Sequence, residues 1–171
     1  SHSGGTNIWR EKDGVFIPKS SSQAVTSTGS GKGIFSLEGC LKDGCKSGKD
    51  AAKLAGFGIK KTKPSVNTKK VVEQAWRNIW CIPTDYPIGQ NGKHFIDQQN
   101  DVTAADIKLA VREGYKSVEH TKRYTTLGMA TDQGKTSNIP GHAILAMTLG
   151  QDIPDTGTTT FRPPFTPITI G

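Results

Sequence analysis

The sequence predicts a mainly α-helical chain, in which one long helix precedes a small helical module and extended segments lie at both ends. Three observations support this class. Lysines and small residues recur at helical spacing between residues 33 and 56, and helix-capping signals recur between residues 94 and 150. Both ends are rich in Ser, Thr, Gly or Pro and show no apolar periodicity.

The long helix is predicted over residues 33–56 and has two faces of different character. The outer face carries lysines and the opposite face carries mostly small residues, namely Lys42, Lys46, Lys49 and Lys53 against Leu37, Cys40, Gly44, Gly48, Ala51 and Ala55. This pattern is typical of a helix that packs closely on a partner while its lysines stay in water.

The helical module is predicted over residues 94–150 from its capping residues. Thr103 and Asp106 have the spacing of a capping box, and Ile107, Ala110 and Val111 form the buried face of the helix that follows. Gly114 ends this helix. Ser117 begins a second helix that runs through Arg123. A third helix begins at Asn138, with Pro140 in its first turn, and ends at Gly150.

The remaining segments are predicted to be less regular. Residues 1–28 are polar and should be mobile, although Val15-Phe16-Ile17 could be a strand end or a loop. Residues 59–70 are predicted to be a charged linker. The apolar run 71–83 could be a helix or a strand, and residues 151–171 are predicted to be extended.

The net charge of +7 is concentrated in one half of the chain. Residues 1–80 contain 14 Lys and Arg against 6 Asp and Glu, whereas residues 81–171 contain 8 against 9. The lysine-rich region lacks the arginines and interleaved aromatic residues that nucleic-acid surfaces favour. We therefore expect no nucleic-acid partner. No apolar run is long enough to cross a bilayer, so no membrane role is expected.

The spacing of cysteines and histidines predicts no metal site, and the motifs of the sequence predict no catalytic site. The three cysteines lack metal-ligand spacing and are predicted to be ordinary thiols of a reducing, cytoplasmic compartment. The four histidines have no ligand spacing either, so no metal is expected. No nucleophile elbow, zinc-protease motif or catalytic carboxylate pair is present, and no catalytic residue is predicted.

The segment KRYTTLGMATDQGKTSN, residues 122–138, is the strongest candidate for ligand binding. It contains Gly134-Lys135-Thr136, the last three letters of a phosphate-binding loop, but Met129 stands where that motif requires its first glycine. Hydroxyls, glycines and cations still suit an anionic ligand. A solvated polar loop between two helices explains the same composition, and both interpretations stay open at this point. The glycine run Gly29–Gly33, which leads into the long helix, is a weaker phosphate candidate.

A longer stretch resembles a known family. FIDQQNDVTAADIKLAVREGYKSVEHTKRYTTLGMATDQGKTSN, residues 95–138, is similar to the α subunit of heterotetrameric sarcosine oxidase and its amine-oxidising relatives. The resemblance implies that residues 1–58 are the C-terminal remnant of an α/β dinucleotide-binding domain ending in its terminal helix. It further implies a connector at 59–93, a helical module at 94–150, and a linker at 151–171 into an absent folate-binding domain.

The resemblance also implies an activity, cofactors and a partner. In that family the complex demethylates sarcosine to glycine, a flavin on the β subunit passes electrons to FMN at the α/β boundary, and peroxide and methylene-tetrahydrofolate are formed. The resemblance also implies that the full-length parent subunit binds NAD. The fragment alone is expected to be inactive and to bind NAD weakly or not at all, because no strand–turn–helix unit precedes Gly29.

Two sets of binding residues follow from the resemblance. One is expected to contact FMN and the β subunit and comprises Lys122, Arg123, Thr125, Thr126, Gln133 and Lys135. The other is expected near NAD and comprises Ser30, Phe35 and Leu37. The alternative is a free-standing binding module, whose lysine face or Gly/Thr-rich loop holds an acidic or phosphate-bearing partner.

Overall fold

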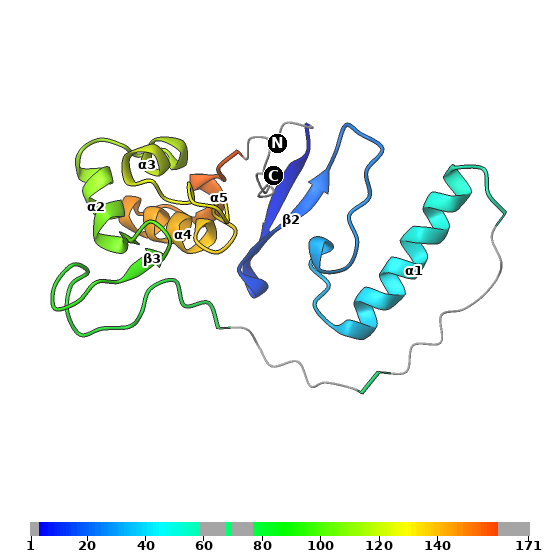
Figure 1. Ribbon diagram of the computed structural model, residues 1–171, viewed down its shortest axis with the longest axis horizontal. Coiled ribbons are helices and arrows are strands. Elements are labelled where there is room, and N and C mark those ends of the chain that lie inside the picture. The colour runs from blue at the N-terminus through cyan, green and yellow to red at the C-terminus, as the bar shows by residue number, and fades with distance from the viewer. Residues whose placement is uncertain (1–3, 59–67, 70–76, 161–171) are drawn as a thin grey trace, which may run out of the picture. The chain divides into compact units, whose positions relative to one another are not determined.

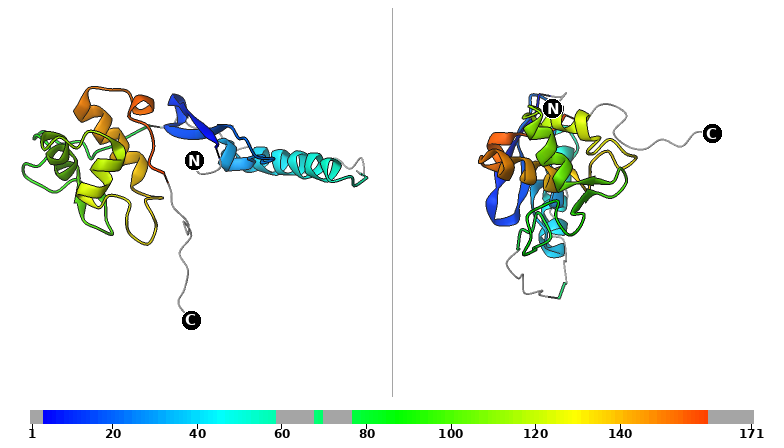
Figure 2. Two further views of the ribbon diagram at one scale, coloured as in Figure 1. Left: turned by 90° about the horizontal axis from the view of Figure 1, so that it is seen from above. Right: turned by 90° about the vertical axis from the view of Figure 1, so that its left-hand side faces the viewer.

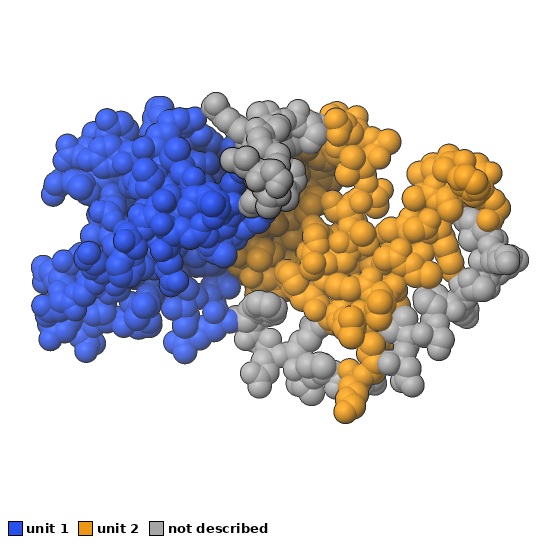
Figure 3. Space-filling model, viewed as in Figure 1, with its two compact units in different colours: residues 1–2, 77–171 blue, residues 3–76 orange. Residues whose placement is uncertain are grey.

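A computed structural model describes residues 4–58, 68–69 and 77–160. The chain divides into two compact units, Ser3–Trp76 and Arg77–Gly171, the second of which also includes Ser1–His2 (Figure 3). The prediction of a mainly α-helical chain is confirmed. Within the described residues, no helix combines the length and the apolar character that crossing a membrane requires.

The first unit begins with an antiparallel hairpin. Strand β1 (Thr6–Arg10) pairs with β2 (Val15–Ser20), and the 3-10 turn Glu11–Asp13 connects them (Figure 1). Trp9 lies opposite Phe16, with their ring centroids 4.9 Å apart. The mobility expected for residues 1–28 stays a prediction, and the strand end considered at Val15-Phe16-Ile17 agrees with β2. The pairing joins residues of two separate strands, which a search for helical periodicity does not detect.

The long helix of the first unit is α1 (Leu37–Leu54), close to its predicted bounds. Ser36 caps it by accepting a hydrogen bond from the Gly39 amide at 3.2 Å. No residue of α1 is buried by the described part of the chain, and the views in Figure 2 show it as one continuous helix. Leu54 is 89% exposed. The predicted close packing on a partner thus stays a prediction.

The second unit begins with the short antiparallel pair β3 (Phe95–Asp97) and β4 (Val102–Thr103). Helix α2 (Ala104–Arg112) follows directly, and the capping box is present as predicted. Asp106 accepts from the Thr103 amide at 2.8 Å, and the Thr103 hydroxyl accepts from the Asp106 amide at 3.3 Å. This reciprocal pair fixes the direction in which α2 leaves the strand.

Three further helices follow in the described part of the second unit: α3 (Val118–Thr125), α4 (Asn138–Leu149) and the short α5 (Ile153–Thr156). Ser117 caps α3 as predicted, by accepting from the His120 amide at 3.2 Å. Gly150 ends α4 in the left-handed conformation, also as predicted. Helix α5 interrupts a segment that was expected to be extended.

The core of the second unit lies around α4, which contacts α2 and α5 (Figure 1). Ile107 and Ala110 of α2 are fully buried, as the periodicity predicted, and Val111 packs against the core. Residues 141–146 of α4 are buried on all sides. Burial of one large aliphatic side chain such as Ile107 contributes about 1.5–3 kcal/mol, so this unit has its own source of stability.

Two predicted connectors fall largely outside the described residues. Most of the linker 59–70 and residues 71–76 of the apolar run are in that category. Residues 77–83, the described part of that run, form neither helix nor strand. Trp80 and Cys81 nevertheless pack against the core, which explains the apolar character of the run.

Candidate functional site

The candidate loop, residues 126–137, connects α3 to α4, and Asp97 fixes its position. This carboxylate is 3% exposed. One oxygen accepts from the amides of Gln99 and Asn100, and the other accepts from the Gly128 amide at 2.8 Å and the Ser137 hydroxyl at 3.3 Å. Because buried carboxylates need several donors, this arrangement is stable only while the loop keeps its shape.

The turn between β3 and β4 provides two more contacts to the same region. The Gln99 side-chain oxygen accepts from the Thr131 hydroxyl at 2.8 Å, and Asn100 Nδ2 donates to the Thr126 carbonyl at 3.0 Å. Thr126 ends α3 in the left-handed conformation. The end of α3 and the candidate loop are thus held by one turn.

Gly134-Lys135-Thr136 does not form a phosphate loop, because a carboxylate of the chain already occupies its donors. Asp132 accepts from the amides of Gly134 and Thr136, both at 3.1 Å, and from the Thr136 hydroxyl at 2.5 Å. The Thr136 hydroxyl and these amides hold the pKa of Asp132 below its ordinary value. The loop therefore carries its own anion where a phosphate would bind.

Two glycines allow the loop to pass close to α4. Gly128 and Gly134 both have positive φ, and a Cβ on either would collide with the Asn138 side chain. Asn138 donates from Nδ2 to the Thr159 hydroxyl at 3.2 Å, so it also holds the segment that follows α5. These glycines were predicted to let the backbone approach a phosphate closely. In the structure they let it approach the Asn138 side chain.

The hydroxyls predicted to contact FMN have partners within the chain. Thr125 donates to the Thr121 carbonyl at 2.7 Å, and Thr126 donates to the carbonyl of Thr125 at 2.6 Å. Their hydrogens are used inside the loop and the helix. Gln133 has a positive φ of 51° in the turn that precedes Gly134. Thr125, Thr126 and Gln133 therefore contribute to the shape of the loop and of the end of α3.

Three predicted cations lie at the end of α3 and on the loop. Arg123 is exposed and pairs with Glu119 at 2.8 Å. Lys135 is exposed, and its ammonium donates to the Asp132 carbonyl at 3.3 Å. Lys122 is half-buried and close enough to His142 to affect its protonation. These are the predicted residues whose charge suits a phosphate.

His142 is the most perturbed titratable group of the second unit. It lies in the second turn of α4 and is 2% exposed. Burial lowers its pKa to about 4, and the positive charge of Lys122 acts in the same direction. The imidazole is therefore neutral near pH 7. Among the described residues, no group of histidine, cysteine and acidic side chains could hold a metal ion.

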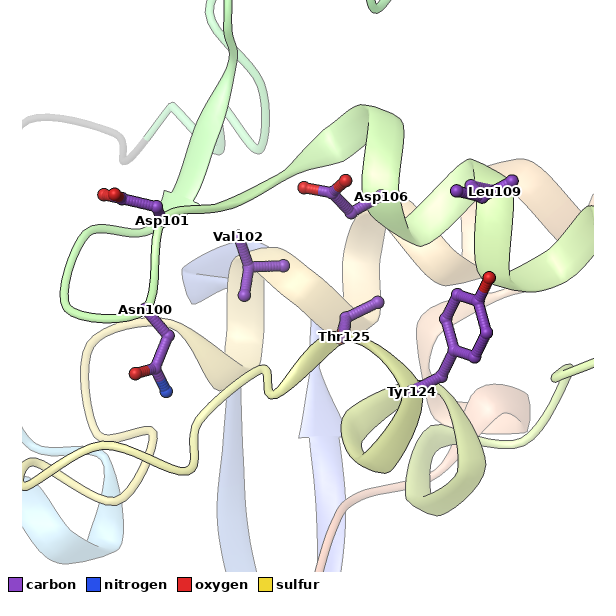
Figure 4. A pocket seen from close by; sticks show the side chains of 7 residues that line it. All are labelled: Asn100, Asp101, Val102, Asp106, Leu109, Tyr124 and Thr125. Atoms are coloured by element: carbon purple, nitrogen blue, oxygen red, sulfur yellow. The ribbon is translucent and has the colours of Figure 1, made fainter.

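A groove of about 260 Å³ lies beside the candidate loop (Figure 4). It is lined by the β3–β4 turn, the first half of α2 and the end of α3, through Asn100, Asp101, Val102, Asp106, Leu109, Tyr124 and Thr125. Asp101 and Asp106 make it anionic. Although Thr125 borders it, the groove does not fit a phosphate.

The residues predicted near NAD surround a second carboxylate-bound turn, in the first unit. Ser30 lies in the 3-10 turn Gly29–Lys32, whereas Phe35 and Leu37 are exposed at the start of α1. Asp43 accepts from the Gly29 amide and the Thr28 hydroxyl, each at 3.0 Å. The Gly29 amide lowers the pKa of Asp43 most strongly.

Sequence reasoning did not identify Asp97 or Asp132, and it identified Asn138 only as the start of a helix and not as a residue that holds the loop. For Asp132 a signal was present, since Asp-x-Gly is typical of a turn in which the carboxylate binds the amides that follow. Asp97 and Asn138 act on residues tens of positions away. Local patterns in the sequence do not show contacts of that kind.

Comparison with known proteins identifies the relatives of the chain. Residues 91–171 match the family model of the sarcosine oxidase A3 domain. The chain is 38% identical over 174 residues to sarcosine oxidase subunit alpha of Rhizobium meliloti (strain 1021), an alignment that covers 99% of the chain and 17% of the relative. Sarcosine oxidase subunit alpha of Corynebacterium sp. (strain P-1) is 34% identical over 172 residues, covering 96% of the chain and 17% of the relative.

The chain spans only 17% of the length of these relatives. The resemblance found in residues 95–138 is nevertheless confirmed, because the alignments extend through both compact units. Residues 91–171 thus match the sarcosine oxidase A3 domain model, and the chain is related along almost its whole length to a segment of sarcosine oxidase alpha subunits.

Proposed function

We propose that this chain acts as a segment of the α subunit of a sarcosine oxidase-like complex, where the end of α3 and the candidate loop contact FMN and the β subunit. The complex oxidatively demethylates sarcosine to glycine, with peroxide and methylene-tetrahydrofolate as further products. FMN supplies the electron-transfer chemistry when bound. The residues of this chain position its phosphate and complete the subunit boundary.

The observation that carries the proposal is a loop held by buried hydrogen bonds, with exposed cations on it and at the end of α3. Asp97, Gly128 and Ser137 fix the loop by hydrogen bonds. Lys135 extends from it, and Arg123 extends from the end of α3, which the same turn holds. Positioned cations bind phosphate more strongly than mobile ones because less side-chain entropy is lost.

The six residues first assigned to FMN have different parts in this proposal. Lys122, Arg123 and Lys135 provide charge to the phosphate. Thr125, Thr126 and Gln133 shape the surface, since the two threonine hydroxyls donate within the chain. The site is shared, so the isolated chain binds FMN poorly.

NAD does not fit the glycine-rich turn of the first unit as it is built here. The Gly29 amide donates to Asp43, and Lys32 pairs with the same carboxylate. A diphosphate at Ser30 would have to displace that carboxylate. We therefore propose that Ser30, Phe35 and Leu37 contribute little to NAD binding in the parent subunit.

The alternative, a free-standing module that binds an acidic partner through the lysine face, is less well supported. Lys42 pairs with Glu38, and Lys46 pairs with Asp50 at 3.0 Å. These carboxylates partly neutralise the face along α1. The alignments also cover both units together, rather than α1 alone.

The proposal is tested in the whole complex by replacing the cations and measuring FMN content per complex. Loss of one charged phosphate contact costs about 1.5–3 kcal/mol, so Lys135→Ala should lower FMN affinity by roughly 10- to 150-fold. Lys135→Arg keeps the charge and should retain FMN. Lys116→Ala, an exposed lysine ahead of α3, is the matched control.

Arg123→Ala and Lys122→Ala are measured in the same way. Because Arg123 also pairs with Glu119, Glu119→Gln separates loss of that ion pair from loss of the phosphate contact. Wild-type FMN content in all three alanine variants would show that the loop is only a spacer.

A further inference from the structure

The groove beside the candidate loop presents hydrogen-bond acceptors and no cation (Figure 4). Asp106 uses one oxygen to accept from the Thr103 amide and hydroxyl, at 2.8 and 2.7 Å, which leaves Oδ1 available. Asn100 directs Nδ2 to the Thr126 carbonyl, which leaves its side-chain oxygen available. Within the part of the chain that the structure describes, no hydrogen bond or ion pair engages the exposed Asp101 carboxylate.

These acceptors are held in place before anything binds. The capping box fixes the Asp106 side chain, and the contact to α3 fixes that of Asn100. Val102, 2% exposed, forms part of the groove wall next to Asp101. A donor that enters the groove therefore meets oxygens from separate elements, α2 and the β3–β4 turn, without first reorganising them.

The other wall of the groove is apolar and aromatic. Leu109 of α2 and Tyr124 of α3 form it. The Tyr124 ring stacks on Tyr115, with centroids 4.6 Å apart and planes 29° apart. These two rings are 42% and 41% exposed, so an aromatic surface continues beyond the groove. Aromatic side chains of this kind are enriched at protein interfaces.

We propose that this groove receives the guanidinium of an arginine from another polypeptide of the assembled complex. A planar group with donors on several edges can contact Asp101, Asp106 and Asn100 together, and its face can lie against an aromatic ring. A lysine ammonium is compact and more strongly hydrated, so it matches this set of separated acceptors less well.

The occupant belongs to a polypeptide because the groove alone would hold a small cation weakly. An exposed charge pair contributes little to affinity, too little to retain a free ligand. The stacked tyrosines provide additional area that a neighbouring chain would cover and a small molecule would not. The arginine thus acts as an anchor within a larger contact.

This inference rests on the multisubunit assembly proposed above, but not on the FMN contact. The groove lining includes none of Lys122, Arg123 and Lys135, so the charged groups of the two proposals differ, although Thr125 belongs to both surfaces. A loss of FMN without a change in assembly would concern only the loop. A change in assembly with normal FMN content would concern only the groove.

The test uses the whole complex, with subunit dissociation on dilution followed by mass photometry. Asp101→Asn removes the charge and still suits the positive φ of 53° at this position, and it should weaken association by about fivefold. Asp101→Lys adds repulsion and should weaken it by more than about tenfold. Asp155→Lys, a charge reversal on α5 outside the groove, is the matched control and should have no effect.

A second arm identifies the partner residue. A photo-crosslinking amino acid in place of Tyr115 should capture a peptide of another subunit that contains arginine. Replacing that arginine by Asp should weaken association in the wild-type complex and restore it with Asp101→Arg. Unchanged association in both Asp101 variants, or a captured peptide without arginine, would overturn the inference.

Discussion

The two glycine-rich turns of this protein use the same local chemistry in different surroundings. In the first unit Asp43 accepts from the Gly29 amide, and in the second Asp132 accepts from the amides of Gly134 and Thr136. The turn Gly29–Lys32, which Asp43 of α1 binds, precedes α1, a helix with no buried residue in the described part of the chain, whereas the turn at Asp132 leads into α4, the core helix. A carboxylate therefore binds each turn, but within the described residues only the second turn leads into a helix with buried residues.

This difference shows that a glycine-rich turn is not by itself a phosphate site. A glycine-rich turn with a nearby helix suggested phosphate binding in both regions. Both turns instead direct amides at a carboxylate of the chain, Gly29 at Asp43 and Gly134 with Thr136 at Asp132. The second turn differs because the core holds it still and displays Lys135 beside it. We consider that rigidity, and not the glycines, is what makes the second region a candidate site.

The largest expected effect is on stability. It compares truncation of a buried side chain in the second unit with truncation of a similar side chain on α1. Ile107→Ala should destabilise the second unit by about 2–5 kcal/mol, because a fully buried side chain leaves a cavity. Leu41→Ala on α1, where the side chain is 47% exposed, should change stability by less than about 0.5 kcal/mol. Urea unfolding followed by circular dichroism measures both. Equal losses would show that α1 is packed as tightly as α2.

The sequence predicted the helices of the second unit well because their signals are local. The Thr103–Asp106 box, the Ser117 cap and the Gly150 stop each act within a few residues. The hairpin Thr6–Ser20 was missed because its stability depends on pairing between strands. The fixed shape of the candidate loop could not be predicted, since Asp97 reaches Gly128 and Ser137 across distances of 31 and 40 residues.

His142 should give the core unit a pH dependence that the first unit lacks. Its pKa falls from 6.5 to about 4 on folding, so the unfolded chain binds more protons between these values and stability is lost as pH falls through this window. The loss between pH 7 and pH 4.5 should be about 2 kcal/mol. Urea unfolding at the two pH values should show that His142→Gln removes this difference and that the exposed His120→Gln does not. A pH dependence unchanged by His142→Gln would contradict the assignment.

A last comparison, of similar size, takes one glycine from each turn. Gly134→Ala should destabilise by about 2 kcal/mol, because φ is +74° and the new Cβ would meet the Asn138 side chain. Gly31→Ala meets no atom within 4 Å and should change stability by less than about 0.5 kcal/mol. Thermal unfolding of the two variants measures the contrast. A neutral Gly134→Ala would mean that the loop has room to move, which would weaken its case as a site.

Amide hydrogen exchange of the 171-residue chain directly tests whether the second unit and its loop are more stable than α1, because it reports the stability of each helix separately. We expect amides of α2 and α4 to exchange at least about tenfold more slowly than those of α1, and the Gly128 amide, bound to Asp97, to be protected with the core. Protection of α1 equal to or greater than that of α4, or a Gly128 amide that exchanges as fast as an exposed one, would contradict this expectation.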